Sequence, residues 1–421
     1  MSVLRRTERP AHRATTRHVQ AAYPFMAEGG LGGRGVHIGT DANGGAFVYD
    51  PWELYGVALT NPNMLVGGQI GKGKSSFVKT YIYRQAVFPR IAWILDPKGE
   101  YGPLAHALGC EPIRLEPNGS VRLNPLTPRA GWNEQVRLLK AVAAAELRRP
   151  LSPAESGALR EALRIIQTNT TEPTLPEIAA LLLRPTSELS DPLATDTATL
   201  AEHVRDVALA LQDLCEGELA GMFDGPTSPG LDFDARCVVL DLSAMYNSEA
   251  IGILMICAAA FQRAVINDLR DRVEAGEQHT RKIISVYDEC WKVIGQIGVG
   301  EWLQESFKLS RSHGTQNIIV IHRLSDLQAA GAAGSRERAL AEGLLADAET
   351  RVIYGQATDQ LDWTRDTLRL TGTETELLPA LDRGVALWKV GQRSFIVRHR
   401  RSRAEEPLSN TDARMSASAG R

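Results

Sequence analysis

Cysteine is scarce in this sequence, and its spacing excludes several classes of protein. Only five cysteines occur among 421 residues, and no two of them stand in the C-x-x-C spacing of a metal or redox site. They are Cys110, Cys215, Cys237, Cys257 and Cys290. An odd, scattered set is typical of a reducing cytosol and argues against a disulfide scaffold or a zinc site.

Long hydrophobic runs and an excess of one charge are also missing. The longest apolar run, Ala250 to Phe261, has 12 residues and is followed at once by Gln262 and Arg263. A membrane-spanning helix needs about 20 apolar residues, so we expect no transmembrane segment. The first 25 residues contain several arginines but no apolar core, so they do not predict a secretory signal. The 47 basic and 50 acidic residues leave a net charge of −3, which excludes a uniformly basic nucleic-acid coat.

The remaining composition is that of an ordinary globular protein. Hydrophobic residues make up 43% of the chain and charged residues 23%. At about 150 residues per domain, a chain of 421 residues predicts two or three structural units. We therefore expect a soluble, cytosolic protein with more than one domain.

The order of apolar patterns predicts an α/β domain split by an all-helical insertion. Short β-type runs, Gly-rich turns and helical stretches alternate on both sides of residues 133–215, as in a mainly parallel sheet with helices. Inside 133–215 the β pattern disappears, and S-P-A-E from Ser152 and T-L-P-E from Thr174 predict helix starts. The predicted segments are an Arg-rich mobile arm (1–34), the first part of the α/β domain with a β-hairpin (35–132), the inserted helical domain (133–215), the second part of the α/β domain (216–403) and a disordered tail (404–421).

Residues 68–75, G-Q-I-G-K-G-K-S, match the P-loop pattern G-x-x-x-x-G-K-[ST] in full. The glycines let backbone N–H groups point at phosphate oxygens, Lys74 supplies a mobile charge for the β- and γ-phosphates, and the Ser75 hydroxyl can ligate Mg²⁺. An apolar strand before the loop and a helix after it supply the context that the motif requires. We therefore predict that ATP and Mg²⁺ bind here. The predicted binding residues are Gly68, Gln69, Ile70, Gly71, Lys72, Gly73, Lys74, Ser75 and Ser76.

A second apolar run, Ile283 to Tyr287, leads into the acid pair Asp288-Glu289. Asp288, at the carboxyl end of a strand, is a predicted ligand of Mg²⁺. Glu289 is placed to orient and deprotonate an attacking water, which hydrolysis needs and simple nucleotide binding does not. We predict Glu289 as the catalytic base; the alternative is a solvated acid pair.

Two further strands end in polar residues with two interpretations each. His322 follows the apolar run 318–321 and either senses the γ-phosphate or caps the next turn as a half-buried histidine. Asp96 follows the run 90–95 and either supports the metal and its water or caps the turn Pro97 to Gly99.

Hydrolysis also needs positive charge against the γ-phosphate, which often comes from a neighbouring subunit. Arg311 is the first candidate for this catalytic role, and Arg351 is the second. A surface arginine in a weak ion pair is the alternative for both.

Several stretches together carry a family resemblance. They are N-P-N-M-L-V-G-G at 61–68, I-L-D-P-K-G-E-Y at 94–101, G-M-F-D-G-P-T-S at 221–228, D-E-C-W at 288–291, and Leu370-Thr371 with Glu374 and Glu376. The chain resembles the VirB-type conjugative type IV secretion ATPases, traffic motors in the FtsK–HerA branch of P-loop ATPases. The similarity runs over about residues 35–400, with the helical insertion where that family has one.

The resemblance implies a RecA-like core that assembles as a homohexamer, with ATP between subunits, and energises a secretion channel. It implies secretion-channel proteins at the inner face of the membrane as partners. Only about 35 to 60 residues precede the core, where the family has a large N-terminal domain, so we expect a separate polypeptide to replace that domain. The family more often has Thr-Gln where this chain has His322-Arg323. Coupling-protein relatives have membrane anchors, and their absence here predicts a cytoplasmic motor that is peripherally attached to the membrane.

Three other functions stay open at the level of the sequence. A DNA-translocating ATPase of the same branch would use DNA as a partner, and the arginines at both ends of the chain favour it slightly. A nucleotide-dependent binding switch would not need Glu289. A small-molecule kinase would need a second-substrate site, which the sequence does not indicate.

Overall fold

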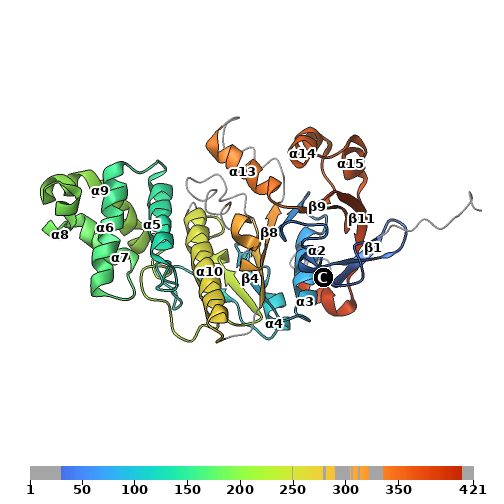
Figure 1. Cartoon of the computed structure of the whole chain (residues 1–421), viewed down its shortest axis with the longest axis horizontal. Helices are drawn as coiled ribbons and strands as arrows, with labels where there is room; N and C mark the ends of the chain where they lie inside the picture. Colours follow the sequence, from blue (N-terminus) through green and yellow to red (C-terminus); the bar gives the residue numbers. More distant parts are fainter. Residues whose placement is uncertain are drawn as a thin grey trace, which may run out of the picture.

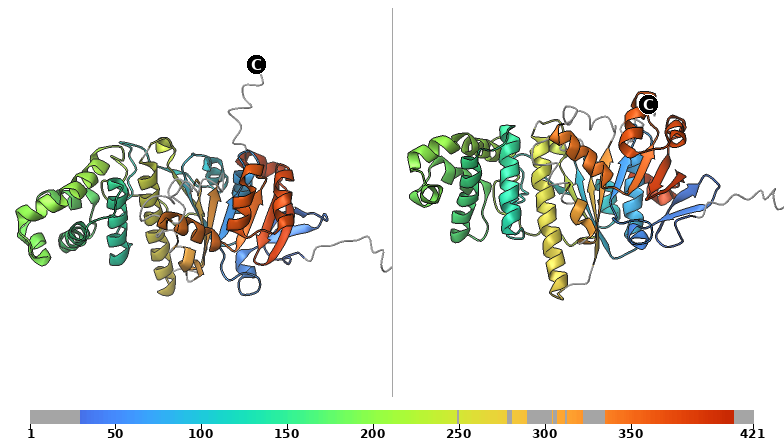
Figure 2. Two further views of the ribbon diagram at one scale, coloured as in Figure 1. Left: turned by 90° about the horizontal axis from the view of Figure 1, so that it is seen from above. Right: turned by 45° about the horizontal axis from the view of Figure 1, so that its top comes forward.

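The computed structural model describes residues 30–248, 250–277, 281–289, 304, 307–311, 313–321 and 335–409. Here one sheet runs through the molecule, and a group of helices lies beyond one end of it (Figure 1). Views from two other directions show the same arrangement (Figure 2). The strands are β1 (Val36–Asp41), β2 (Ala46–Tyr49), β3 (Met64–Gly67), β4 (Arg90–Asp96), β5 (Ile113–Arg114), β6 (Cys237–Asp241), β7 (Lys282–Tyr287), β8 (Thr315–Ile321), β9 (Thr350–Tyr354), β10 (Val385–Val390) and β11 (Arg393–His399).

The helices differ widely in length. The α-helices are α2 (Pro51–Leu54), α3 (Lys74–Gln85), α4 (Gly102–Ala107), α5 (Trp132–Leu147), α6 (Pro153–Asn169), α7 (Leu175–Leu183), α8 (Ser187–Ser190), α9 (Thr197–Glu216), α10 (Ile251–Glu274), α13 (Arg336–Ala346), α14 (Leu361–Leu368), α15 (Gly372–Leu377) and α16 (Glu406–Ser409). Single 3₁₀ turns are η1 (Asp191–Leu193), η2 (Ser243–Met245), η4 (Thr358–Gln360), η5 (Leu378–Ala380) and η6 (Arg403–Glu405).

The sheet has 11 strands in the order β2-β1-β11-β10-β9-β3-β8-β7-β4-β6-β5. Neighbouring strands are parallel from β9 to β5 and antiparallel from β2 to β9. The predicted α/β fold with a mainly parallel central sheet, interrupted by helices, is confirmed. β8, the strand that precedes His322, lies between β3 and β7.

The parallel strands bring three sequence motifs to one edge of the sheet. β3 ends at Gly67, β4 at Asp96 and β7 at Tyr287. Because these strands run in the same direction, their carboxyl ends meet at the same edge, where ligands bind in open α/β sheets. The P-loop, the Asp-Pro-Lys-Gly-Glu stretch and the Asp-Glu pair all follow these ends.

Two hydrophobic clusters cover the two faces of the sheet. Along β4, Trp93 and Leu95 belong to one cluster, whereas Ala92 and Ile94 belong to the other. This alternation is the two-residue period of a strand that is buried on both sides.

α10 is the apolar helix that the sequence predicts near residues 249–269. By length and composition it could cross a membrane, but 83% of its most apolar 18-residue window is buried inside the protein. It packs against β4 on one side and α5 on the other. The burial of α10 is that of a core helix.

The helices α5–α9 lie between β5 and β6 along the chain and form the group at one end of the molecule (Figures 1 and 2). Both predicted helix starts are confirmed, because Ser152 with Glu155 and Thr174 with Glu177 form capping boxes. In α9, Leu200, Val204, Val207, Leu211 and Leu214 lie about one helical turn apart and are buried. We propose residues 133–215 as the bounds of an inserted helical domain.

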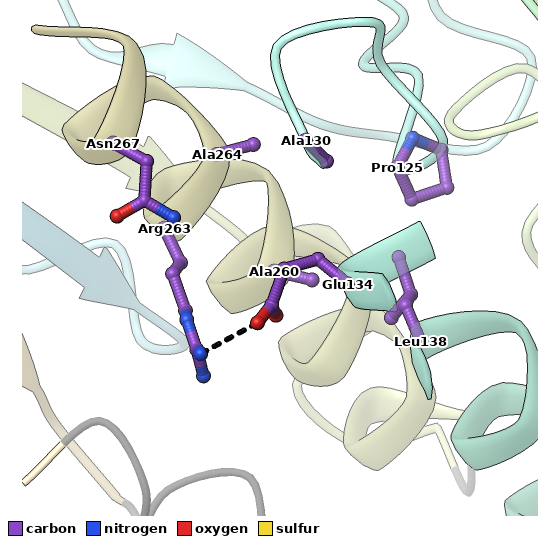
Figure 3. Close-up of a pocket in the computed structure, with 8 residues that line it drawn as sticks. All are labelled: Pro125, Ala130, Glu134, Leu138, Ala260, Arg263, Ala264 and Asn267. Carbon is purple, nitrogen blue, oxygen red and sulfur yellow. Dashed lines mark hydrogen bonds and ion pairs between the residues drawn. The ribbon is translucent and has the colours of Figure 1, made fainter. Parts of the chain in front are cut away.

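A small pocket lies at the seam between this helical group and the rest of the protein (Figure 3). An ion pair closes one side of it, where Arg263 Nη2 of α10 donates to Glu134 Oε1 of α5 at 2.7 Å. The Arg263 side chain is 9% exposed and that of Glu134 is 24% exposed. The helical group is therefore attached through a partly buried charge pair as well as apolar contacts.

The substitution Glu134→Ala is expected to lower the free energy of unfolding by about 1–3 kcal/mol, because it removes the carboxylate that a largely buried guanidinium contacts. Chemical denaturation followed by circular dichroism measures the change. Glu202→Ala removes an exposed carboxylate from α9 and serves as the control. Equal stability of the two variants would contradict the importance of the pair.

The prediction of a disordered tail is wrong over residues 404–409. These residues form η6 and α16, and α16 packs against α3 and α4. Arg84 of α3 forms a bidentate pair with Glu405, and Leu408 is buried. A capping box from Ser402 to Glu405 starts this turn. Residues 410–421 and residues 1–29 of the predicted arm lie outside the described residues.

Candidate active site

The P-loop connects β3 to α3 with a backbone that only glycine adopts easily. Gly68, Gly71 and Gly73 have φ angles of +143°, +79° and +112°. A Cβ atom on Gly68 would lie 2.6 Å from Cβ of Tyr354, so a side chain there would collide with β9. Gly73 caps α3 without a side-chain hydrogen bond to the first turn. The loop and the start of this helix thus present N–H groups that can donate hydrogen bonds to a bound anion.

Lys74, the P-loop lysine, is buried and folded back on its own loop. It is 3% exposed, and its Nζ donates to the carbonyl oxygens of Gly68 at 2.5 Å and Gln69 at 2.9 Å. Burial lowers the pKa of Lys74 to about 8, although Asp288 and Glu289 favour its charged form. The charges of the acid pair that follows β7 therefore act on the P-loop lysine. This is consistent with the carboxyl ends of β3 and β7 lying at the same edge of the sheet.

The connection between β9 and β10 holds the P-loop from the side, which the sequence did not indicate. The N–H of Gln69 donates to the Gly355 carbonyl at 3.0 Å, and Lys72 Nζ donates to the Leu381 carbonyl at 3.0 Å. In the opposite direction, the N–H of Gly384 donates to the Lys72 carbonyl at 2.8 Å.

Two more residues of the P-loop segment have distinct surroundings. Ser76 accepts a contact from Nη1 of Arg401, at 3.5 Å from its Oγ. Ile70, at the tip of the loop, is 73% exposed. The loop is therefore fixed along its flank and open at its tip.

The acid pair at the end of β7 is buried and ordered by hydrogen bonds. Asp288 is 4% exposed and Glu289 is 1% exposed. Asp288 Oδ2 accepts the Tyr101 hydroxyl at 3.0 Å, and Asp288 Oδ1 accepts the N–H of Glu289 at 2.9 Å. The φ of Glu289 is +53°, a left-handed conformation that costs about 1–3 kcal/mol for a residue with a side chain.

The loop after β4 contributes two residues to which the sequence assigned no role, Lys98 and Tyr101. The ammonium of Lys98 forms an ion pair with Oε1 of Glu289, and Tyr101 binds Asp288 as described. Burial opposes the charge of Lys98, but the hydrogen bond to Glu289 raises its pKa above the ordinary value. Both residues belong to the I-L-D-P-K-G-E-Y stretch that the sequence singles out. The sequence does not indicate that they contact Glu289 and Asp288.

Asp96 makes the contacts of a turn cap. Its Oδ2 accepts the N–H of Tyr101 at 2.8 Å and its Oδ1 accepts the N–H of Lys98 at 3.3 Å. Burial raises the pKa of Asp96 to about 7, against these hydrogen bonds. Of its two interpretations, these contacts favour the cap.

The two candidate arginines lie at the other edge of the sheet. Arg311 is exposed, just before the amino end of β8. Arg351 lies near the amino end of β9, where its guanidinium donates to the carbonyls of Ala348 at 3.1 Å and Leu368 at 2.8 Å. Burial lowers the pKa of Arg351. Neither lies at the edge that carries the P-loop of its own chain, and His322 falls outside the described residues.

The donor set fits Mg²⁺ bound together with a nucleotide. Ser75 offers a hydroxyl at the start of α3 and Asp288 a carboxylate at the end of β7. Within the part of the chain that the structure describes, no group of three or more His, Cys, Asp or Glu side chains could hold a metal alone. Mg²⁺ is commonly held in this way, by one or two protein oxygens together with substrate phosphates and water.

Comparison with solved structures shows the same fold in proteins of low sequence identity. VirB4 of Thermoanaerobacter pseudethanolicus matches with a TM-score of 0.73 and 21% identity, over 90% of this chain and 100% of that chain. The plasmid coupling protein TrwB in complex with ADP and Mg²⁺ matches with a TM-score of 0.60 and 15% identity, over 90% of this chain and 93% of that chain. TrwB in complex with the ATP analogue ADPNP matches with a TM-score of 0.60 and 15% identity, over 88% and 91%. No protein-family model matches the sequence, and no curated protein does.

Proposed function

We propose that this protein is a Mg²⁺-dependent ATPase that energises a conjugative or type IV-like secretion system. The observation that carries the proposal is that the P-loop with its buried Lys74 and the buried pair Asp288-Glu289 follow the carboxyl ends of β3 and β7, at the same edge of the sheet. A phosphate-binding loop with a buried carboxylate pair next to its lysine is suited to phosphoryl chemistry.

Each residue of the site has one task in binding. Residues 68–76 bind the phosphates through backbone N–H groups other than that of Gln69, which donates to Gly355. Lys74 exchanges its carbonyl partners for the β- and γ-phosphates. The Ser75 hydroxyl and the Asp288 carboxylate hold Mg²⁺. Bound Mg²⁺ would neutralise the charge on the β- and γ-phosphate oxygens.

Glu289 performs the proton transfer. Its carboxylate accepts a proton from water while the water oxygen forms a bond to the γ-phosphorus. The bond between that phosphorus and the oxygen bridging to the β-phosphate breaks, and its electron pair leaves with ADP. The hydroxyl of Tyr101 donates to Asp288 and keeps that carboxylate oriented. Arg311 is the proposed source of positive charge from a neighbouring subunit, and His322 the proposed sensor of the γ-phosphate.

The solved structures of similar fold support both the nucleotide and the process. TrwB is described as a conjugative coupling protein and has been solved with ADP and Mg²⁺ and with ADPNP. VirB4 shares the fold over its full compared length. We further propose that the present chain is a motor that forms a homohexamer and binds secretion-channel proteins at the cytoplasmic side of a membrane.

Removal of divalent metal tests the proposed chemistry directly. Phosphate release from ATP should fall to background with EDTA, because the charge of the triphosphate is no longer neutralised when the metal is removed. Phosphate release should return when excess Mg²⁺ is added. The same assay with duplex DNA tests the translocase alternative: stimulation that weakens with salt would favour it. A protein that binds ATP with Mg²⁺ but never releases phosphate would be a switch, and the proposed hydrolysis would be wrong.

Self-assembly is tested separately. Size-exclusion chromatography with light scattering should give a mass near six chains in the presence of a non-hydrolysable ATP analogue. A monomer under all nucleotide conditions would contradict a homohexamer of the isolated chain.

A further inference from the structure

Lys98 occupies the centre of the candidate site without any role in the P-loop and acid-pair scheme. Its ammonium contacts Oε1 of Glu289, a side chain that is 1% exposed, whereas the Lys98 side chain itself is 26% exposed. The ring of Tyr246 lies 5.9 Å from the Lys98 ammonium. Lys98 thus joins a buried carboxylate to a more open part of the site.

The loop that carries Lys98 is built to keep it there. Asp96 accepts the N–H groups on both sides of the turn, from Lys98 and Tyr101. Gly99 has a φ of +68°, and a Cβ on it would lie 2.9 Å from Oγ of Ser243. The fixed backbone delivers Lys98 to Glu289 and Tyr101 to Asp288, so one loop contacts both carboxylates.

Two lysine ammonium groups converge on the same acid pair. Burial lowers the pKa of Lys74, and the nearby charge of Lys98 lowers it further. Two cations held close together form a place that an anion would stabilise. If Lys74 binds the γ-phosphate, as the proposed function requires, that phosphate is an anion within the field of both ammonium groups.

We propose that Lys98 is a positioning residue for Glu289. The ammonium of Lys98 holds the Glu289 carboxylate in the absence of ATP and moves from it to the γ-phosphate when ATP binds. This inference rests on the proposed ATPase function. A lysine suits the task because its compact charge sits on a flexible four-carbon stem. Lys98 gives up one anion when it gains the other, so the exchange contributes little to ATP affinity. It acts on the hydrolysis step, by freeing Glu289 for water and by stabilising the charge on the transferred phosphate.

The substitution Lys98→Met tests the exchange. We expect kcat to fall about 100- to 1,000-fold, as for the loss of one preorganised charge-stabilising donor. The Kd values for ADP and for a non-hydrolysable ATP analogue should stay within about threefold of wild type. The contact that the substitution removes contributes little to the binding of nucleotide before hydrolysis. Lys98→Arg keeps the charge and should recover at least about tenfold of the lost kcat.

The matched control is Lys79→Met. Lys79 is a buried lysine beside the same loop, but its ammonium lies 3.6 Å from Glu100, and its ion pair does not involve Glu289. We expect its kcat to stay within about threefold of wild type. Nucleotide affinity and thermal melting of all three variants show whether each is folded.

The possible outcomes separate this inference from the proposed function. A Lys98→Met protein with wild-type kcat overturns the inference. Parallel losses of ADP affinity, thermal stability and kcat in both Lys98→Met and Lys79→Met overturn it too, because they indicate a structural role. If Glu289→Gln hydrolyses ATP at the wild-type rate, the assignment of the base itself fails. An inactive Glu289→Gln with a fully active Lys98→Met removes only Lys98 from the mechanism.

Discussion

Glu289→Gln is expected to lower kcat for ATP hydrolysis about 100- to 10,000-fold while ATP stays bound, the range that general base catalysis usually contributes. An amide is nearly the same shape as the carboxylate but cannot accept a proton from water. The backbone N–H of Glu289 would still donate to Asp288, and Tyr101 would still hold the other oxygen of Asp288. The phosphate cradle at residues 68–76 does not involve the Glu289 side chain. Phosphate release and filter binding of radiolabelled ATP measure the two effects separately.

Glu100→Gln is the control for this prediction. Glu100 belongs to the same site loop, but its carboxylate pairs with Lys79 instead of Lys98. The kcat of this variant for ATP hydrolysis should stay close to that of wild type. Wild-type turnover by Glu289→Gln would show that another group takes the proton, and the hydrolytic role of the acid pair would have to be reassigned.

The parts of the fold that follow from local sequence were predicted correctly. β3, the P-loop and α3 are consecutive in the chain, so their order follows from the sequence, and the apolar run R-I-A-W-I-L indicates the strand β4. The helix starts at Ser152 and Thr174 are likewise local signals. The short helical segment formed by η6 and α16 was missed, although S-R-A-E at 402–405 is the same type of signal. Its stability comes from the distant Arg84, for which the sequence offers no local indication.

The candidate site shows the same division between local and long-range information. Lys74, Ser75, Asp288 and Glu289 stand in recognisable motifs. The ion pair of Lys98 with Glu289 depends on β4 and β7 being neighbours, with Leu95 opposite Tyr287, which no spacing in the sequence reveals. The contact of Arg401 with Ser76 likewise needs the C-terminal segment to return to α3, because the two residues are 325 positions apart in the sequence. Side chains that motifs carry could be found from sequence, and side chains that sheet order brings together could not.

Lys74→Met is expected to weaken ATP binding by about 2–5 kcal/mol, the loss that follows when one partner of a buried charge pair is removed. At about 1.4 kcal/mol for each tenfold change, this corresponds to about 30- to 4,000-fold in Kd. Wild-type protein should melt at higher temperature with ATP and Mg²⁺, because a ligand that binds the folded state stabilises it. The variant should lose this shift. Isothermal titration calorimetry and thermal melting measure the two quantities.

The fold of Lys74→Met is expected to survive, which makes the loss of binding interpretable. Lys74 is 3% exposed, and burial disfavours its charge strongly enough to lower its pKa to about 8. Methionine fills similar space without a charge whose burial is unfavourable. Lys79→Met removes another buried lysine of the same helix, α3, and should keep both the ATP affinity and the melting shift. If both variants lose ATP binding equally, the effect reflects damage to α3, and Lys74 is not the phosphate-binding lysine that the P-loop motif predicts.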